Sequence, residues 1–240
     1  MKKPLSLLVF LLFSCLCTAQ SPYEVSWGLD GPLLGSGIGV LATSHFLGKK
    51  MEAFDESAIG QLRRESVGPF DRSTTYRWST TAQKHSDILV YSSFALPTLL
   101  LADSEVNNNP KEFTLIYLET LVINTALTNL LKNTAKRTRP YVYNPDPTIP
   151  FNLKLKKDAR RSFFSGHTST AASMSFLTAR MYSDFHPDSK ARPYIWAGAA
   201  IIPAATGYLR VRGGKHFPTD VITGYVVGSL LGIFLPALHK

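Results

Sequence analysis

Six stretches of this chain are almost free of charged side chains. They cover residues 33–47, 88–102, 113–131, 168–179, 193–209 and 221–238, and Glu119 is their one Asp, Glu, Lys or Arg. Apolar runs of this length, bounded by proline, glycine and polar residues, are typical of buried or membrane-spanning helices. The sequence therefore predicts an all-α fold, a single-domain bundle of about six helices.

The bundle is expected to be embedded in a membrane. Run 113–131 is the best spanning candidate by length, and runs 193–209 and 221–238 are also long enough to cross a bilayer. Their glycine, alanine and serine residues suit close contacts between helices in lipid. A soluble bundle is the alternative, because several runs are short and the mean hydropathy of the chain is low for a protein with many spans.

The N-terminus resembles an export signal. Lys2 and Lys3 precede an apolar run at 5–16, and Ala19 ends a small-residue cleavage site, so residues 1–19 are predicted to be a cleavable signal peptide. An uncleaved signal anchor and a lipoprotein signal using Cys15 are the alternatives. Both cysteines, Cys15 and Cys17, lie in this segment, so the mature chain would have no disulfide and no thiolate metal site.

The charge balance favours anionic partners. The chain carries 26 Lys and Arg against 17 Asp and Glu, a net charge of +9. Such a surface suits anionic substrates or lipid headgroups, and nucleic acid is not expected as a partner of an exported chain with apolar helices. Four histidines have no acidic or cysteine pattern that specifies a metal, and ordinary surface or core roles are expected for them: His45, His85, His186 and His239.

Two polar clusters lie at the ends of apolar runs. Lys132 and Arg139-Pro140 follow run 113–131, and their spacing of nearly two turns puts both cations on one face if the helix persists to Pro140. Ser165-Gly166-His167 lies where a loop enters the helix near residue 168. Glycine lets an anion approach the backbone there, and a helix start offers unpaired N–H groups.

A third cluster precedes the last run. Arg210 is followed by His216 and Asp220, and Pro218 is placed to start a helix. Because His216 and Asp220 stand four residues apart, the carboxylate can accept a proton from one imidazole nitrogen and direct the other outward. Basic residues at one helix end are common, but three separate segments that each supply anion-binding or proton-transfer groups indicate one site.

The order and spacing of these clusters resemble those of the type 2 phosphatidic acid phosphatase (PAP2) superfamily, which includes vanadium haloperoxidases and bacterial class A acid phosphatases. The resemblance covers about residues 113–238. It rests on three motifs: Lys132-x6-Arg139-Pro140, Ser165-Gly166-His167 and Arg210-x5-His216-x3-Asp220.

The resemblance implies a role for each motif residue. His216 would be the nucleophile, Asp220 would orient it, and His167 would protonate the leaving oxygen. The phosphate oxygens would be held by Lys132, Arg139, Arg210, Ser165 and the Gly166 backbone. It also implies that residues 113–240 form the catalytic core, that residues 20–112 supply N-terminal helices and a connecting loop, and that no metal or cofactor is needed.

Two positions depart from the family pattern. Phe164 stands where the second motif usually has proline, and Leu209 stands where the third usually has serine. The first change leaves the reacting groups intact and alters the loop. The second removes a hydroxyl that could contribute about 1–3 kcal/mol to phosphate binding.

The expected function is metal-independent hydrolysis of a phosphorylated lipid, a monoester or pyrophosphate, through a phosphohistidine intermediate. The alternatives are a soluble periplasmic acid phosphatase of broad specificity, a vanadium-dependent haloperoxidase and a non-enzymatic phospholipid-binding membrane protein. The expected partners are the lipid substrate and the bilayer, with no obligate protein partner.

The chain is placed in a bacterial-type cell envelope with the active site facing the periplasm. If residues 1–19 are cleaved off and all six runs span the membrane, the site would instead face the cytoplasm. A periplasmic site is recovered if run 33–47, which is short and glycine-rich, does not cross.

Overall fold

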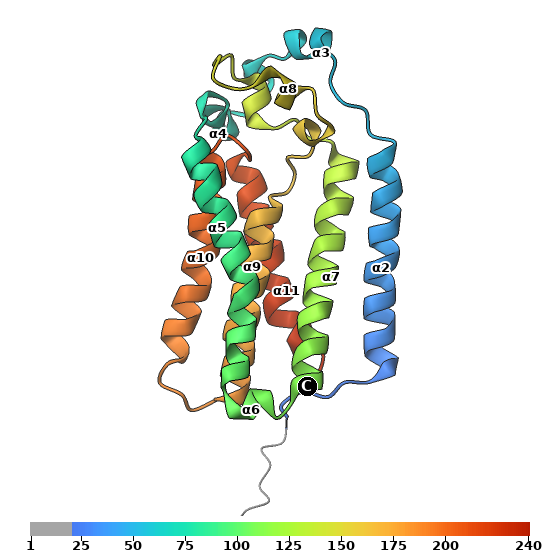
Figure 1. Ribbon diagram of the computed structural model, residues 1–240, viewed down its shortest axis with the longest axis vertical. Helices are drawn as coiled ribbons and strands as arrows, with labels where there is room; N and C mark the ends of the chain where they lie inside the picture. The colour runs from blue at the N-terminus through green and yellow to red at the C-terminus, as the bar shows by residue number, and fades with distance from the viewer. Residues whose placement is uncertain (1–20) are drawn as a thin grey trace, which may run out of the picture.

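Six long helices lie side by side along one axis (Figure 1). The computed structural model describes residues 21–240, so the predicted signal peptide at 1–19 lies outside the described residues. The α-helices are α2 Trp27–Lys49, α3 Glu56–Gln61, α4 Pro69–Arg72, α5 Thr80–Thr98, α6 Ser104–Asn107, α7 Pro110–Ala135, α8 Phe151–Lys154, α9 Gly166–Phe185, α10 Arg192–Arg212 and α11 Pro218–Ala237. The 3-10 helices are η2 Arg64–Ser66, η3 Ser73–Tyr76, η4 Leu99–Ala102, η5 Pro140–Tyr143 and η6 Lys157–Arg160.

The predicted all-α fold is confirmed, since residues 21–240 contain helices, turns and bends but no strand. Each predicted apolar run falls on one of the long helices, although run 88–102 continues past the end of α5 into η4 and run 221–238 ends one residue beyond α11. The start of α5 differs most from expectation. It begins at Thr80, where the Ser79 side chain accepts a hydrogen bond from the N–H of Ala82, and so includes polar residues that precede the apolar run.

Helix α2 is longer than its apolar run suggested. It has 23 residues and packs beside α7, and such a helix is about 35 Å long. The segment that contains run 33–47 is therefore longer than the run, and the expectation that it does not cross a bilayer stays a prediction. By length and hydropathy together, two segments of the described chain qualify as spans, Pro110–Tyr143, which contains α7, and Pro218–Ala237.

Close packing of α9 against α11 brings two of the motifs together. A methyl group added to Gly224 would lie 2.6 Å from the carbonyl oxygen of Ser165. One added to Gly228 would lie 2.2 Å from the carbonyl oxygen of Ser169. Glycine is therefore required at both places, and the two backbones approach as they do in small-residue helix pairs of membranes. At the upper end of this contact the N–H of Ser165 donates to the carbonyl of Asp220.

The connections 50–79 and 136–165 cover the upper end of the bundle in Figure 1. They enclose a small apolar core of their own, formed by Tyr141, Val142, Ile149 and Ala159. The α10–α11 turn packs into this cap, because Gly214 has a φ of +68° and a Cβ there would lie 2.2 Å from the Arg77 carbonyl. The two connections, called the cap below, hold in place the loop segments that carry the polar motifs.

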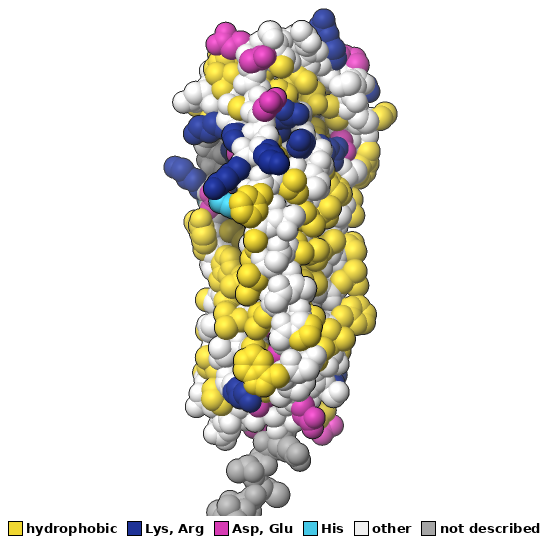
Figure 2. Space-filling model, turned by 90° about the vertical axis from the view of Figure 1, so that its right-hand side faces the viewer, with side chains coloured by type: hydrophobic (Ala, Val, Ile, Leu, Met, Phe, Trp, Pro, Cys, Tyr) yellow, Lys and Arg dark blue, Asp and Glu magenta, His cyan; other side chains and the backbone are white. Residues whose placement is uncertain are grey.

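The outer surface of the bundle is apolar along its length. In Figure 2 the Lys and Arg side chains gather near the upper end, while hydrophobic and uncharged groups cover most of the body below. Helix α11 presents an exposed stripe at every fourth residue, Ile222, Val226, Leu230 and Phe234, opposite its buried glycines. Exposed apolar stripes of this extent are typical of surfaces that contact lipid or another protein.

Candidate active site

His216 lies in the turn between α10 and α11 and is 1% exposed. Its Nδ1 is 2.8 Å from the carbonyl oxygen of Ser162, and its Nε2 is 3.0 Å from Nη1 of Arg139. A carbonyl can only accept a hydrogen bond and a guanidinium can only donate one. His216 is therefore neutral, with its proton on Nδ1 and a lone pair on Nε2, the nitrogen that faces the cations of the site.

Arg139 holds this arrangement through several contacts. Its Nη1 also donates to the Lys215 carbonyl, and its Nε and Nη2 donate to the carbonyl and the carboxylate of Asp158, all at 2.9 Å. The expected shared helix face with Lys132 is not formed, because α7 ends at Ala135 and Lys136 takes a left-handed conformation, with φ of 47°. Arg139 is extended, as a residue before proline prefers, and reaches the site from the loop.

Asp220 contacts His216 less directly than its spacing suggested. Its Oδ2 is 3.7 Å from Nδ1 of His216, too far for a hydrogen bond, and instead accepts from Ser162 Oγ and from the N–H of Phe217. Ser162 thus links the two residues, because its hydroxyl donates to Asp220 while its carbonyl accepts from His216. Asp220 is thus connected to the imidazole through Ser162, and it caps α11 at the same time.

Arg137 belongs to the same network, although it is not part of any of the three motifs. Its guanidinium donates to Asp220, to Asp71 of α4 at 2.7 Å and to Thr219 at 2.7 Å. Asp71 also accepts from the N–H and the hydroxyl of Thr219. The buried charge of Asp220 is therefore balanced by Arg137, which in turn is held by the cap.

His167 lies in the first turn of α9 and pairs with Asp87 of α5. Its Nε2 is 2.8 Å from Oδ1 of Asp87, which also accepts from Nη1 of Arg210 at 3.3 Å. Arg210, at the end of α10, also donates to Ser86 Oγ at 3.2 Å. Asp87 therefore connects the second and third motifs, a link that no spacing in the sequence indicates.

Lys132 and the start of α9 form the remaining side. A methyl group added to Gly166 would lie 3.6 Å from Nζ of Lys132 and 3.0 Å from Thr128, so glycine keeps the approach to the helix start open. The Ser165 side chain caps α9 by accepting from the N–H of Thr168. The unpaired N–H groups of a first helical turn and the Lys132 ammonium both favour an anion here.

The pKa values of groups in the α10–α11 turn and in the cap agree with this arrangement. Burial, and then the positive charges of Arg139, Lys132 and Arg210, hold the pKa of His216 well below its ordinary value. Burial and the neighbouring Arg139 and Arg210 lower the pKa of Lys215 to about 8. Burial raises the pKa of Asp158, but Arg139 and Lys132 outweigh it and keep that pKa below the usual range.

A groove of about 200 Å³ leads away from His167 along the bundle. Its walls come from α5, α7 and α9, and they are lined by Val90, Tyr91, Phe94, Thr125, Thr128, Asn129, Gly166, His167 and Thr170. Because Tyr91 is largely exposed, the groove reaches the outer surface between helices. An elongated apolar group can lie in it with its polar end at the histidine.

The two departures from the motif pattern occupy different surroundings. Phe164 is fully buried and lies where a side chain on Gly224 would meet its ring, so it packs the loop against α11. Leu209 is half-buried in the last turn of α10, directly before Arg210. Neither change displaces the charged groups described above.

Comparison with known proteins decides the family. The family model of the PAP2 superfamily matches residues 113–240, more than half of the chain. The chain belongs to the PAP2 superfamily. The matched region contains all three motifs, whereas Asp71 and Asp87, which complete the network, lie before it.

Two PAP2-related proteins illustrate the likeness. A lipid A 4'-phosphatase of Porphyromonas gingivalis is 30% identical over 79 residues, which are 33% of this chain and 30% of that protein. This match thus spans less than a third of the relative. A transmembrane PAP2 type phosphatidylglycerolphosphate phosphatase from Bacillus subtilis has the same fold, with a TM-score of 0.54 and 19% identity over 84% of this chain and 94% of that one.

Proposed function

We propose that this protein hydrolyses a phosphate monoester or pyrophosphate of a lipid through a phosphohistidine on His216, without a catalytic metal. The neutral tautomer of His216 carries the proposal. Its unprotonated Nε2 faces Arg139, and Lys132 and Arg210 contribute further positive charge around it. An unprotonated nitrogen among three cations is suited to attack on a phosphate.

The first step forms a bond from Nε2 of His216 to phosphorus and breaks the bond from phosphorus to the ester oxygen. An arriving phosphate takes over the Arg139 N–H that now faces Nε2, which frees the lone pair. Charge on the equatorial oxygens is stabilised by the cations and by the N–H groups at the start of α9. Asp220, acting through Ser162, stabilises the positive charge that develops on the ring.

His167 supplies the proton in this step and recovers it in the next. With Nε2 bound to Asp87, its Nδ1 is the nitrogen that can give a proton to the leaving oxygen. The positive charge of Arg210 disfavours the protonated form of His167, and the negative charge of the bound phosphate offsets this effect. Water then attacks phosphorus, His167 accepts a proton from the water, and the bond to Nε2 breaks.

A lipid substrate and a membrane location are supported by the surface of the bundle. The groove below His167 is open to the side between α5 and α7, where Tyr91 of its lining is largely exposed. A lipid lying in the bilayer can enter it sideways and place its phosphate at the histidine. The names of the two relatives, both lipid phosphatases, agree with this substrate class.

The direct test is a panel of phosphorylated lipids and soluble phosphate esters, assayed with purified protein in EDTA. We expect turnover of one or more lipids that is unaffected by EDTA and exceeds that of every soluble ester. Equal or faster turnover of soluble esters would favour a broad-specificity acid phosphatase. Loss of activity in EDTA, at a temperature where circular dichroism shows folded protein, would contradict chemistry without metal.

The pH profile should reflect the lowered pKa of His216. A lowered pKa keeps the ring unprotonated in more acidic solution, so the acid limb of kcat/KM is expected below pH 6.5. Above about pH 8 the Lys215 ammonium loses its proton, and KM should rise if it attracts the phosphate. Steady-state kinetics across the pH range test this, and an acid limb above pH 6.5 would contradict the proposed nucleophile.

The side of the membrane that the site faces depends on α2. If this helix crosses the bilayer with its neighbours, the site and residue 21 lie on opposite sides (Figure 1). A signal peptide cleaved after residue 19 would leave the new N-terminus in the periplasm. The site would then face the cytoplasm, so a cleaved signal and a periplasmic site cannot both hold in this arrangement. A reporter fused within the 50–79 connection, which lies at the site end, distinguishes the two arrangements.

A further inference from the structure

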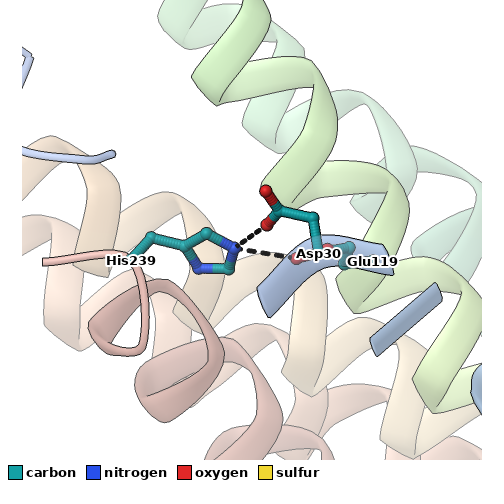
Figure 3. Close-up of side chains that lie close together, drawn as sticks. All are labelled: Asp30, Glu119 and His239. Atoms are coloured by element: carbon teal, nitrogen blue, oxygen red, sulfur yellow. Dashed lines mark hydrogen bonds and ion pairs between the residues drawn. The ribbon is translucent and has the colours of Figure 1, made fainter. Parts of the chain in front are cut away.

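Three ionisable side chains are buried together at the end of the bundle opposite the active site. Asp30 lies in the first turn of α2, Glu119 faces inward from α7, and His239 directly follows α11 (Figure 3). Their exposed fractions are 4%, 0% and 2%. Glu119 lies about 20 Å along α7 from Lys132, so the proposed phosphatase chemistry does not use this cluster.

One nitrogen of His239 faces both acids. Its Nδ1 is 3.0 Å from the carbonyl oxygen of Leu235 and therefore carries a proton that it donates there. Its Nε2 lies 2.9 Å from Oδ1 of Asp30 and 3.0 Å from Oε2 of Glu119. A histidine whose Nδ1 is held by a backbone carbonyl while Nε2 meets carboxylates has the orientation typical of a metal ligand.

Glu119 has no other partner in this arrangement. Apart from the 3.0 Å approach of Oε2 to His239, its two fully buried carboxylate oxygens have no hydrogen-bond donor among the described residues outside this cluster. With both acids ionised and His239 neutral, the three side chains carry two negative charges in an apolar interior, which is costly without a positive counterpart. A divalent cation bound between two carboxylates and a neutral imidazole would leave no net charge.

We propose that Asp30, Glu119 and His239 bind a divalent transition metal ion of the Zn²⁺ class. One ligand atom from each residue lies within 4.8 Å of the others. In a tetrahedral zinc site such atoms are about 3.3 Å apart, so a small outward shift of the side chains makes room for the ion. The imidazole favours zinc-like ions over Mg²⁺ and Ca²⁺, which prefer oxygen ligands.

The surroundings provide access and suggest a structural role. A groove of about 580 Å³ between the starts of α2 and α7 is lined by Asp30 and gives room for a water as fourth ligand. The ion would join α2, α7 and the short segment that follows α11, which are up to 209 positions apart in sequence. Because α2 packs mainly against α7, such a link fastens it to the rest of the bundle. This proposal replaces the ordinary role that the sequence suggested for His239.

The test uses the full chain in detergent, without an affinity tag, stripped of metal and then freed of chelator. We expect one Zn²⁺ per chain by calorimetry, a visible spectrum of tetrahedral Co²⁺, and a higher Tm with metal. Glu119→Gln and His239→Ala should each weaken Zn²⁺ binding at least about 100-fold and abolish the metal-dependent rise in Tm. Glu119→Gln should keep its kcat below its unfolding temperature.

His186→Ala is the matched control. His186 lies at the same end of the bundle, but its Nε2 faces Asp103 at 3.1 Å while its Nδ1 faces Glu105 at 3.6 Å, so the two acids share no position for an ion. This variant should bind Zn²⁺ like the unmodified chain. The proposal is overturned if the folded, unmodified chain binds no stoichiometric metal, or if Glu119→Gln and Asp30→Asn both bind it with unchanged affinity.

Discussion

Replacing His216 by alanine should reduce kcat by at least about 10⁴-fold, with the protein still folded. The variant loses the nitrogen that we propose as the nucleophile, while Arg139, Lys132 and Arg210, the proposed phosphate-binding cations, remain. Substrate binding should therefore change much less than turnover. Initial rates on the best lipid of the panel and equilibrium binding of the same lipid separate the two effects.

The covalent intermediate gives this prediction a second readout. A chain quenched during turnover of a ³²P-labelled substrate should carry label that survives alkali and is lost in acid, as expected for a phosphohistidine. His167→Asn should still be labelled by an ester with a good leaving group, because that group needs no proton. Its label should persist longer, since the base that activates water is missing.

His85→Ala serves as the control for these measurements. His85 is exposed on α5, and with 100° between successive residues it points away from the face that carries Asp87. Its kcat and labelling should match those of the unmodified chain. Turnover by His216→Ala at the unmodified rate, or label that remains on that variant, would remove His216 as the nucleophile.

The gathering of most motif residues at one end of the bundle could be predicted because these residues are tied to helix ends. His167 and Asp220 lie in the first turns of α9 and α11, and Arg210 lies in the last turn of α10. A short spacing within one helix fixes such positions without knowledge of the tertiary fold. Arg139 lies in the site, but not on a helix face shared with Lys132 as its spacing suggested, because it reaches His216 from an extended loop after α7.

The acids that hold these residues could not be predicted. Asp71 lies in the cap, Asp87 near the start of α5, and Asp158 in a 3-10 helix, so each meets its partner only through tertiary packing. Their shared signal is indirect. A buried cluster of cations requires nearby carboxylates when no substrate is bound, and that requirement names no position in the sequence.

Helix lengths were underestimated for a related reason. The apolar runs mark the part of each helix that contacts core or lipid. Helix α5 begins with polar residues at the site end, before its run, whereas α2 begins six residues before its run at the opposite end of the bundle. Hydrophobicity therefore located the helices and their order but not their ends. The caps at Ser79 and Ser165 define two of those ends, and both are serines that accept from a backbone N–H three residues on.

Gly228→Ala should lower the free energy of unfolding by about 3 kcal/mol. The added methyl would lie 2.2 Å from the Ser169 carbonyl and 2.8 Å from the Ala172 side chain, so α11 must move away from α9. That movement would separate Ser165 from Asp220, whose backbones are hydrogen-bonded one turn above. Turnover should fall together with stability, although Gly228 contacts no group of the site.

Gly198→Ala is the comparison that isolates this effect. Gly198 lies inside α10 with no atom within 4 Å of an added methyl, and alanine is favoured over glycine in a helix by up to about 1 kcal/mol. This variant should be as stable as the unmodified chain or slightly more so, with unchanged kcat. Thermal unfolding and lipid turnover, measured for both variants in one detergent, test the difference. Equal stability of the two would mean that contact between α9 and α11 does not set the geometry of the catalytic end.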